Sequence, residues 1–361
     1  MTFAFSLPFD SVNHKILLVK LKQYGIEDNW FSGYLSNRIQ YVRGYQESSS
    51  LVLSGVPQGS VLGPTLFNLF VNDLPNIVSD LSGCRIIQYA DDTQLLVTGS
   101  PSDLGNIIAR LKLAMCRLSA WFCRNQLLLN VNKSQVIVFG SKYFVKRMHI
   151  SNIDIFGTPV PLQSSIMNLG VKFDSTLTWD GHIGLVTSKC VGMLKRISLL
   201  RNVMPAKTIV MLINCLVLPH IRFCLSVWGR CNATQAKRVN KIIKFARRIA
   251  GNEAQRLAWR GDMRAEHNIT MLKIIRTCLF FPENMPHYVC SLFKVRQSDR
   301  ATRQHDDLEL PLPKLEVKRM SFSYQGVRLW NSLPISVRNL PKKEFYAYIY
   351  DKGQKGELCD H

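Results

Sequence analysis

The sequence has no long hydrophobic run and no closely spaced cysteine pair. Its most apolar stretch, TIVMLINCLVLPHI at residues 208–221, is too short to span a bilayer and contains Pro219, so we expect a buried helix there. The start, MTFAFSLPFD, lacks the basic residues and the hydrophobic length of a secretory signal. Ten cysteines are scattered without a Cys-x-x-Cys pair or zinc-finger spacing. These features predict reduced thiols in an intracellular protein, nuclear or cytoplasmic, that is neither secreted nor embedded in a membrane.

Basic charge is scarce in the first hundred residues and abundant afterwards. Residues 1–100 hold 6 Lys+Arg against 8 Asp+Glu, whereas the remainder holds 40 against 17. Residues 183–260 contain 15 Lys+Arg and a single acid, Glu253. At 361 residues the chain is long enough for two or more domains. We therefore expect a packed unit followed by one that binds a polyanion, with nucleic acid favoured over an anionic membrane surface.

Two adjacent carboxylates interrupt two apolar runs in IIQYADDTQLLV, residues 86–97. The pattern predicts two strands joined by a tight turn, with Asp91 and Asp92 at its tip. An ordinary solvated turn is the alternative interpretation of these twelve residues.

The apolar spacing changes along the chain from a mixture of helix and strand to helix alone, which predicts an α+β unit followed by a helical one. Expected helices cover residues 12–26, 62–74, 102–121 and much of 182–249; expected strands lie within 40–55, 135–140 and 168–174. Asp10 or Ser11 is available to cap the first helix, and Gly25 to end it.

The segment KRVNKIIKFARRI, residues 237–249, predicts a helix with one apolar and one basic face. Its basic side chains could simply be solvated, but the lack of acids around them favours contact with a phosphate backbone. The basic face consists of Lys237, Arg238, Lys241, Lys244, Arg247 and Arg248.

Five ordered motifs resemble the reverse transcriptases of LINE-type (non-LTR) retrotransposons. They are FDSVNH (9–14), SGVPQGSVLGP (54–64), QYADD (88–92), LNVNKS (129–134) and NLGVKFDSTLTW (168–179), and SFSYQGVRLWNSLP (321–334) resembles a C-terminal segment of the same open reading frames. The resemblance implies a polymerase right hand: an α+β palm, an antiparallel sheet with helices, over residues 1–180 and an α-helical basic thumb over 181–260. Residues 261–361 would form the C-terminal segment.

The resemblance also implies an RNA-directed DNA polymerase that uses Mg²⁺, deoxynucleoside triphosphates, an RNA template and a DNA primer. In that family pattern Asp91 is a metal ligand, Asp92 supports it, and Lys133 lies near the triphosphate. The nucleotide and template would contact Phe9, Gly55, Pro57, Gln58, Gly59 and Tyr89.

One ligand position departs from the family. An aspartate that bridges both metals in the family is Ala4 here, and Leu7 and Pro8 also differ from the motif. Asp10 lies six residues on, at a position that suits a helix cap, so we do not expect it to substitute. Loss of one carboxylate predicts chemistry slower by at least ~10³-fold.

The chain also begins inside this first motif, which leads us to expect an N-terminally truncated protein without fingers or endonuclease. A non-catalytic nucleic-acid-binding remnant or domesticated module is the alternative to a working polymerase.

Overall fold

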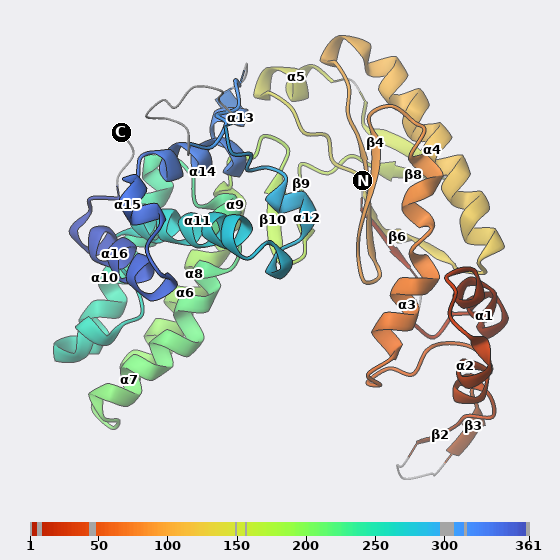
Figure 1. Ribbon diagram of the computed structural model, residues 1–361, viewed down its shortest axis with the longest axis horizontal. Helices are drawn as coiled ribbons and strands as arrows, with labels where there is room; N and C mark the ends of the chain where they lie inside the picture. Colours follow the sequence, from red (N-terminus) through yellow and green to blue (C-terminus); the bar gives the residue numbers. More distant parts are fainter. Residues whose placement is uncertain are drawn as a thin grey trace. The chain divides into compact units, whose positions relative to one another are not determined.

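The computed structural model describes residues 2–5, 9–42, 48–148, 150–155, 157–296, 307–313 and 316–358. It contains two compact units (Figure 1). The first comprises Met1–Gly170 with Asp174–Leu177, and the second Val171–Phe173 with Thr178–His361. Each unit is considered by itself below.

The first unit mixes strands and helices, as its sequence pattern predicts. Its helical elements are α1 (His14–Gln23), α2 (Asp28–Leu35), α3 (Gly63–Val71), η1 (Leu74–Val78), η2 (Pro101–Asp103), α4 (Leu104–Arg124) and α5 (Lys142–Arg147). Its strands are β1 (Thr2–Phe5), β2 (Ile39–Val42), β3 (Ser48–Leu51), β4 (Cys84–Tyr89), β5 (Asp92–Val97), β6 (Leu129–Gln135), β7 (Asn152–Ile155), β8 (Thr158–Pro161) and β9 (Ser165–Asn168). Strand β10 (Val171–Asp174) lies where the chain passes between the units.

A four-stranded sheet with the order β4-β5-β1-β6 organises the first unit. Strand β1 pairs antiparallel with β5 on one side and with β6 on the other. Helix α4 lies alongside β4 and β5 (Figure 1). It buries Leu111, Met115, Leu118 and Trp121 from the periodic apolar face that predicted it. The antiparallel sheet and its helices agree with the expected α+β class.

Two local predictions were wrong. Asn13, not Asp10 or Ser11, caps α1, because its side-chain oxygen accepts hydrogen bonds from the amides of Lys15 and Ile16. A strand was expected over residues 135–140, but the observed strand, β6, ends at Gln135. Val136 makes only an isolated bridge. Since β6 is the last strand of its sheet and is polar (LNVNKSQ), it lacks the apolar alternation that marks a buried strand.

The regular structure in the described residues of the second unit is almost entirely helical. Its elements are α6 (Asp180–Leu199), α7 (Ala206–Leu212), η3 (Ile213–Val217), α8 (Leu218–Arg222), α9 (Leu225–Trp228), α10 (Ala233–Ala250), η4 (Gly251–Arg256), α11 (Met263–Phe280), η5 (Pro282–Asn284), α12 (His287–Cys290), α13 (Glu316–Arg319), α14 (Phe322–Asn331), α15 (Ile335–Arg338) and α16 (Lys342–Lys355). Two hydrophobic clusters fill it, one running from Ile183 to Met263 and the other from Ile269 to Leu358.

The apolar stretch at 208–221 is helical, as predicted, and buries one face, while Met211 and Leu216 are exposed. It runs without a break through α7, the π-helical turn η3 and α8, and Pro219 directly follows the first residue of α8. None of the helices in the described residues is long and apolar enough to cross a membrane. The palm, thumb and C-terminal assignments stay predictions.

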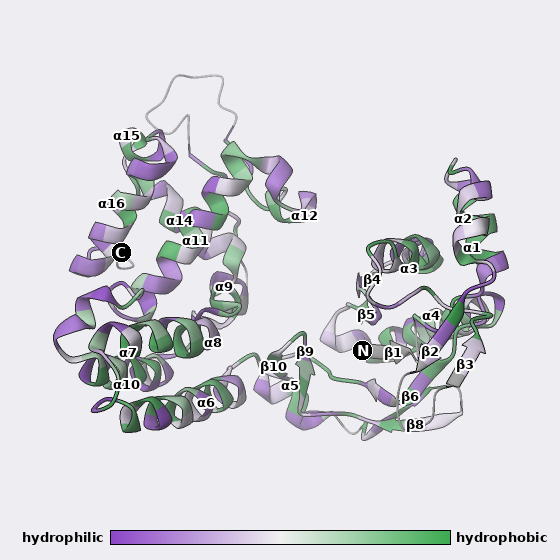
Figure 2. Cartoon of the chain, turned by 90° about the horizontal axis from the view of Figure 1, so that it is seen from below, coloured by the Kyte–Doolittle hydropathy of each residue, from purple (hydrophilic) through white to green (hydrophobic). Residues whose placement is uncertain are grey.

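Helix α10 has the two faces that its sequence predicts. Hydrophilic and hydrophobic residues alternate along it (Figure 2). Its apolar face is buried, and Asn232 and Gln235 form a capping box at its start. The six basic side chains of the opposite face are all exposed.

Candidate active site

The two carboxylates lie at the tip of the β4–β5 hairpin, as predicted. Tyr89 pairs with Asp92, so Ala90 and Asp91 form a two-residue turn. Ala90 has a φ of +50°. Such turns need a positive φ, which costs a residue with a Cβ about 1–2 kcal/mol. Strain of this kind is found where a turn fixes the direction of functional side chains.

The local environment disfavours negative charge at the second carboxylate. Asp91 and Asp92 are both half-buried. Burial raises the pKa of Asp92 above the usual value of 3.8, and the neighbouring Asp91 raises it further. A bound cation would relieve both effects.

Strand β1, which carries residue 4, pairs with β5 of this hairpin. Phe3 pairs with Thr93 in β5, and Ala4 follows Phe3 on the same strand. On its other side Ala4 pairs with Asn130 of β6. Residues 7 and 8, which also depart from the family motif, lie outside the described residues.

The residues at the tip fit a two-metal centre only in part. Mg²⁺ requires oxygen ligands, and Asp91 and Asp92 supply two carboxylates from one hairpin. An alanine at position 4 supplies no ligand atom from the adjacent strand. Within the described residues, no group of three His, Cys, Asp or Glu side chains is arranged to hold a metal ion.

Hydrogen bonds join two of the five motifs, residues 9–14 and 54–60. The amide of Gly55 donates to Val12 O at 2.8 Å, and the amide of Val56 donates to Phe9 O at 2.7 Å. His14 Nε2 lies 2.7 Å from Gly55 O, which can only accept. The loop 54–60 is thereby fixed to the segment that follows β1.

Asp10 belongs to this junction and not to a helix cap. Its Oδ1 accepts a hydrogen bond from Gln58 Nε2 at 2.9 Å, and its carbonyl oxygen accepts one from Ser54 Oγ at 2.9 Å. The expectation that Asp10 caps a helix is therefore wrong, because its side chain holds the loop instead.

Glycine is required at the closest point of the junction. Gly55 has a φ of +93°, and a Cβ built on it would lie 2.7 Å from Asp10 Cα and 2.9 Å from Phe9 O. Gly59 also has a positive φ, +83°, but a Cβ there would meet no atom within 4 Å.

A pocket of about 720 Å³ opens beside the same loop. Its polar side chains come from three segments of the first unit: Asp10, Arg38 with Gln40, and Ser54 with Gln58. The backbone of Gly55 and the ring of Pro57 complete that wall. Of the predicted loop residues, Gly55, Pro57 and Gln58 therefore line one cavity.

The other predicted residues of the first unit differ in their surroundings. Phe9 is half-buried, and its ring centroid lies 4.6 Å from that of Phe67, so it contributes to the core. Tyr89 is 66% exposed at the end of β4. Lys133 is exposed on β6, where the pairing with β1 is irregular. Its backbone amide donates to Asn130 Oδ1 at 3.2 Å.

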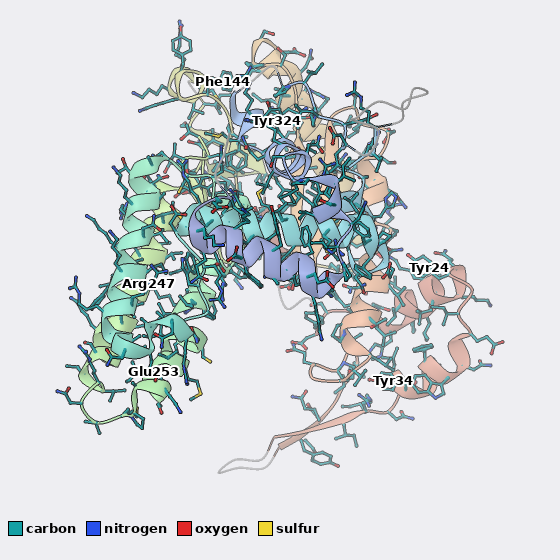
Figure 3. All side chains as sticks on the ribbon, turned by 60° about the vertical axis from the view of Figure 1, so that its left-hand side comes forward. Tyr24, Tyr34, Phe144, Arg247, Glu253 and Tyr324 are labelled. Carbon is teal, nitrogen blue, oxygen red and sulfur yellow. The ribbon has the colours of Figure 1, made fainter. Side chains whose placement is uncertain are left out.

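Two pockets in the second unit border the basic face of α10. One, of about 400 Å³, is lined by Lys237, Lys241, Lys244 and Arg247 among others. The other, of about 670 Å³, shares Arg247 and adds Arg260 and Lys355. Figure 3 labels Arg247 on α10, and Glu253, the single acid of residues 183–260, just beyond that helix. Glu253 pairs with Arg256 at 2.7 Å.

Sequence reasoning missed one feature of the first unit. Trp30 and Tyr34 on α2 stack on one another, and the Arg38 guanidinium lies over the Tyr34 ring. The spacing of four residues between Trp30 and Tyr34 was the available signal for their stacking, since such residues share one side of a helix, whereas Arg38 lies beyond the end of α2.

Comparisons with known proteins place the first unit in a family. Residues 2–173 match the family model "Reverse transcriptase (RNA-dependent DNA polymerase)". The chain is 28% identical over 259 residues to the "Probable RNA-directed DNA polymerase from transposon BS" of Drosophila melanogaster, which covers 66% of this chain and 27% of that protein. It is 27% identical over 255 residues to the "RNA-directed DNA polymerase from mobile element jockey" of the same organism, covering 67% and 27%.

These similarities cover only part of the related proteins, and the structural comparison adds no information about the fold. The chain spans about a quarter of the length of the two relatives. A telomerase chain of Candida albicans, solved with a fragment of telomeric RNA, aligns at 13% identity with a TM-score of 0.23 over 69% of this chain and 43% of that one; a score of this size says nothing about the fold. On the family match and the relatives, residues 2–173 of this chain form a reverse transcriptase domain homologous to the RNA-directed DNA polymerases of non-LTR retrotransposons.

Proposed function

We propose that this chain binds primer and template as a non-LTR reverse transcriptase does, but has lost most of its capacity to transfer nucleotides. The observation that carries the proposal is alanine at position 4, on the strand that pairs with β5 of the Asp91–Asp92 hairpin. Its expected cost is at least ~10³-fold in rate, because a two-metal centre with one carboxylate removed loses several kcal/mol of positioned charge.

In this proposal the first unit is the palm. Asp91 is a direct ligand for Mg²⁺ and Asp92 supports it, and the raised pKa of Asp92 is in keeping with two carboxylates crowded at one tip. Two bound Mg²⁺ ions would stabilise the attacking and leaving oxygens of the transfer. Since position 4 has no oxygen to offer, the chain's own residues do not complete that centre.

The loop 54–60 is the proposed contact for the incoming nucleotide and the template. Gly55 allows close approach of the backbone, and the hydrogen bond to Asp10 holds the Gln58 amide in place at the pocket. Phe9, Pro57, Gly59 and Tyr89 are assigned to the same contact, and Lys133 to the triphosphate, through the family pattern. The deoxynucleotide would occupy the cavity beside the loop.

The second unit supplies affinity for the phosphate backbone. We assign it as the thumb with the C-terminal segment, and α10 as its contact helix. In the described part of the chain no acidic side chain pairs with Lys237, Lys241 or Lys244. Their charges are therefore available to a polyanion.

Primer extension with the full chain tests the proposal. The unaltered chain, Asp91→Ala, Ala4→Asp and Ala4→Asp/Asp91→Ala are compared on an RNA template and DNA primer with Mg²⁺ or Mn²⁺. We expect extension only by Ala4→Asp. Extension by the unaltered chain that is abolished by Asp91→Ala would contradict the proposed defect. Binding without extension by any variant would favour the second candidate, a non-catalytic nucleic-acid-binding module.

A further inference from the structure

Three planar side chains form a column at the end of α2. The rings of Trp30 and Tyr34 are stacked, with centroids 5.3 Å apart and an interplanar angle of 10°. The Arg38 guanidinium carbon lies 4.5 Å from the centroid of the Tyr34 ring. Asn37, between the end of α2 and Arg38, adopts a φ of +54°. Figure 3 shows Tyr34 where α2 leads into the β2–β3 hairpin.

The outer end of the column faces solvent. Trp30 is 61% exposed, an unusual state for the side chain with the largest apolar surface. Phe31 contacts it in an edge arrangement, at a centroid distance of 5.0 Å and an angle of 85°. Burying this indole would stabilise α2 more than leaving it exposed. The exposed ring is therefore better suited to contact a ligand than to stabilise the helix.

The inner end of the column reaches the predicted nucleotide and template loop. Arg38 lines the pocket of about 720 Å³ together with Asp10 and Gln58. Within the described residues no acidic side chain forms an ion pair with Arg38. One end thus offers a cation beside the pocket, and the other end offers an open aromatic surface.

We propose that the Trp30–Tyr34–Arg38 column is a stacking platform for the bases of single-stranded nucleic acid. Aromatic rings bind unpaired bases of any sequence because every base has a π-face, and an arginine adds cation–π and phosphate contacts. The bases of a duplex are stacked on one another and cannot use such a surface. The ligand is therefore the unpaired part of a template strand, and this inference rests on the proposed function.

Fluorescence anisotropy of labelled oligonucleotides tests the platform. Affinities of the full chain are measured for an unpaired RNA and for a blunt duplex of the same length, at one fixed salt concentration. Trp30→Ala is expected to weaken binding of the unpaired RNA roughly 5- to 150-fold and to leave binding of the duplex unchanged. Trp30→Phe, which keeps a ring, is expected to restore most of the affinity.

Tyr143→Ala is the matched control. Tyr143 is also an exposed aromatic residue of the first unit with an arginine over its ring, since Arg147 lies 4.9 Å from its centroid, but it is not part of the column. This substitution is expected to change neither affinity.

A second readout does not depend on truncating the side chain. A base stacked on Trp30 quenches indole emission, so RNA should quench the unaltered chain more than it quenches Trp30→Phe. Equal quenching in the two chains, or equal losses of affinity in Trp30→Ala and Tyr143→Ala, would overturn the platform. If neither RNA nor duplex binds the unaltered chain, the proposed function fails as well.

Discussion

The junction between residues 9–14 and the loop 54–60 has no room for a methyl group at Gly55. In Gly55→Ala the new Cβ would lie 2.7 Å from Asp10 Cα and 2.9 Å from Asp10 O and Phe9 O. These neighbours are backbone atoms and cannot rotate away. The backbone would also keep a φ of +93°, which an alanine adopts only under strain.

The expected loss of stability has two parts. The left-handed backbone costs a residue with a Cβ about 1–2 kcal/mol. Forcing a methyl group into a closely packed site costs about 1–3 kcal/mol more. Gly59→Ala is the matched control, because Gly59 has a φ of +83° but a Cβ there meets no atom within 4 Å. Gly59→Ala should lose only the stability that the left-handed backbone costs, about 1–2 kcal/mol.

Hydrogen exchange measured by mass spectrometry reports the stability of the first unit separately from that of the second, because it is read from individual peptides. Peptides from α3, whose Leu66 and Phe67 are fully buried, report opening of the core next to the loop. The second part of the cost predicts exchange about 5- to 150-fold faster in Gly55→Ala than in Gly59→Ala. Equal exchange in the two variants would show that the loop is not held against Asp10 as described.

Three further predictions concern buried charge, pH and salt. Lys20 Nζ is buried against Phe70 O and Asp73 Oδ1, each at 2.6 Å, and burial lowers the pKa of Lys20. Asp73→Ala removes a partner that is itself partly exposed, so we expect the free energy of unfolding in urea to fall by about 2–3 kcal/mol. Because the pKa of Asp92 is raised, the folded chain holds that proton more tightly than the unfolded chain, and stability falls as pH rises from 3.8 through the folded pKa. Asp92→Asn should therefore raise the thermal midpoint at pH 7, with a difference that narrows as the pH approaches 4. Replacing three lysines of α10 by glutamine should lower the salt slope of single-strand binding by about 2; they are Lys237, Lys241 and Lys244.

Each of these predictions has a control. Asp73→Asn keeps one oxygen, which can accept from Lys20 Nζ or from Trp121 Nε1 but not from both, and it should lose less stability than Asp73→Ala. A midpoint difference for Asp92→Asn that is the same at every pH would contradict the charge argument. An equal removal of charge from exposed lysines of the first unit, Lys112, Lys142 and Lys146, should leave the salt slope unchanged.

Elements with a strong local signal could be predicted from the sequence. The β4–β5 hairpin has two apolar runs around a polar turn, and α10 has a regular apolar face, so both agree with the structure. Strand β6 could not be located, because an end strand with polar residues gains its stability from pairing with β1 and shows little alternation.

The candidate site was predictable as a set of motifs but not as an arrangement. Nothing in the local sequence indicates that Asp10 accepts from Gln58, since the two residues are distant in the chain and meet only when α1 and the loop are packed. The contact of Arg38 with Tyr34 likewise involves residues on either side of the end of α2, with Asn37 at a positive φ between them. Contacts that depend on tertiary folding leave no periodic trace in the sequence.

The claim that alanine at position 4 prevents binding of a metal pair can be tested by counting the bound metal ions. Electron paramagnetic resonance of Mn²⁺ is recorded on the full chain and on Ala4→Asp, each with primer, template and a deoxynucleotide. We expect a magnetically coupled pair of ions in Ala4→Asp and no coupled pair in the unaltered chain. A coupled pair in the unaltered chain that disappears in Asp91→Ala would contradict the account.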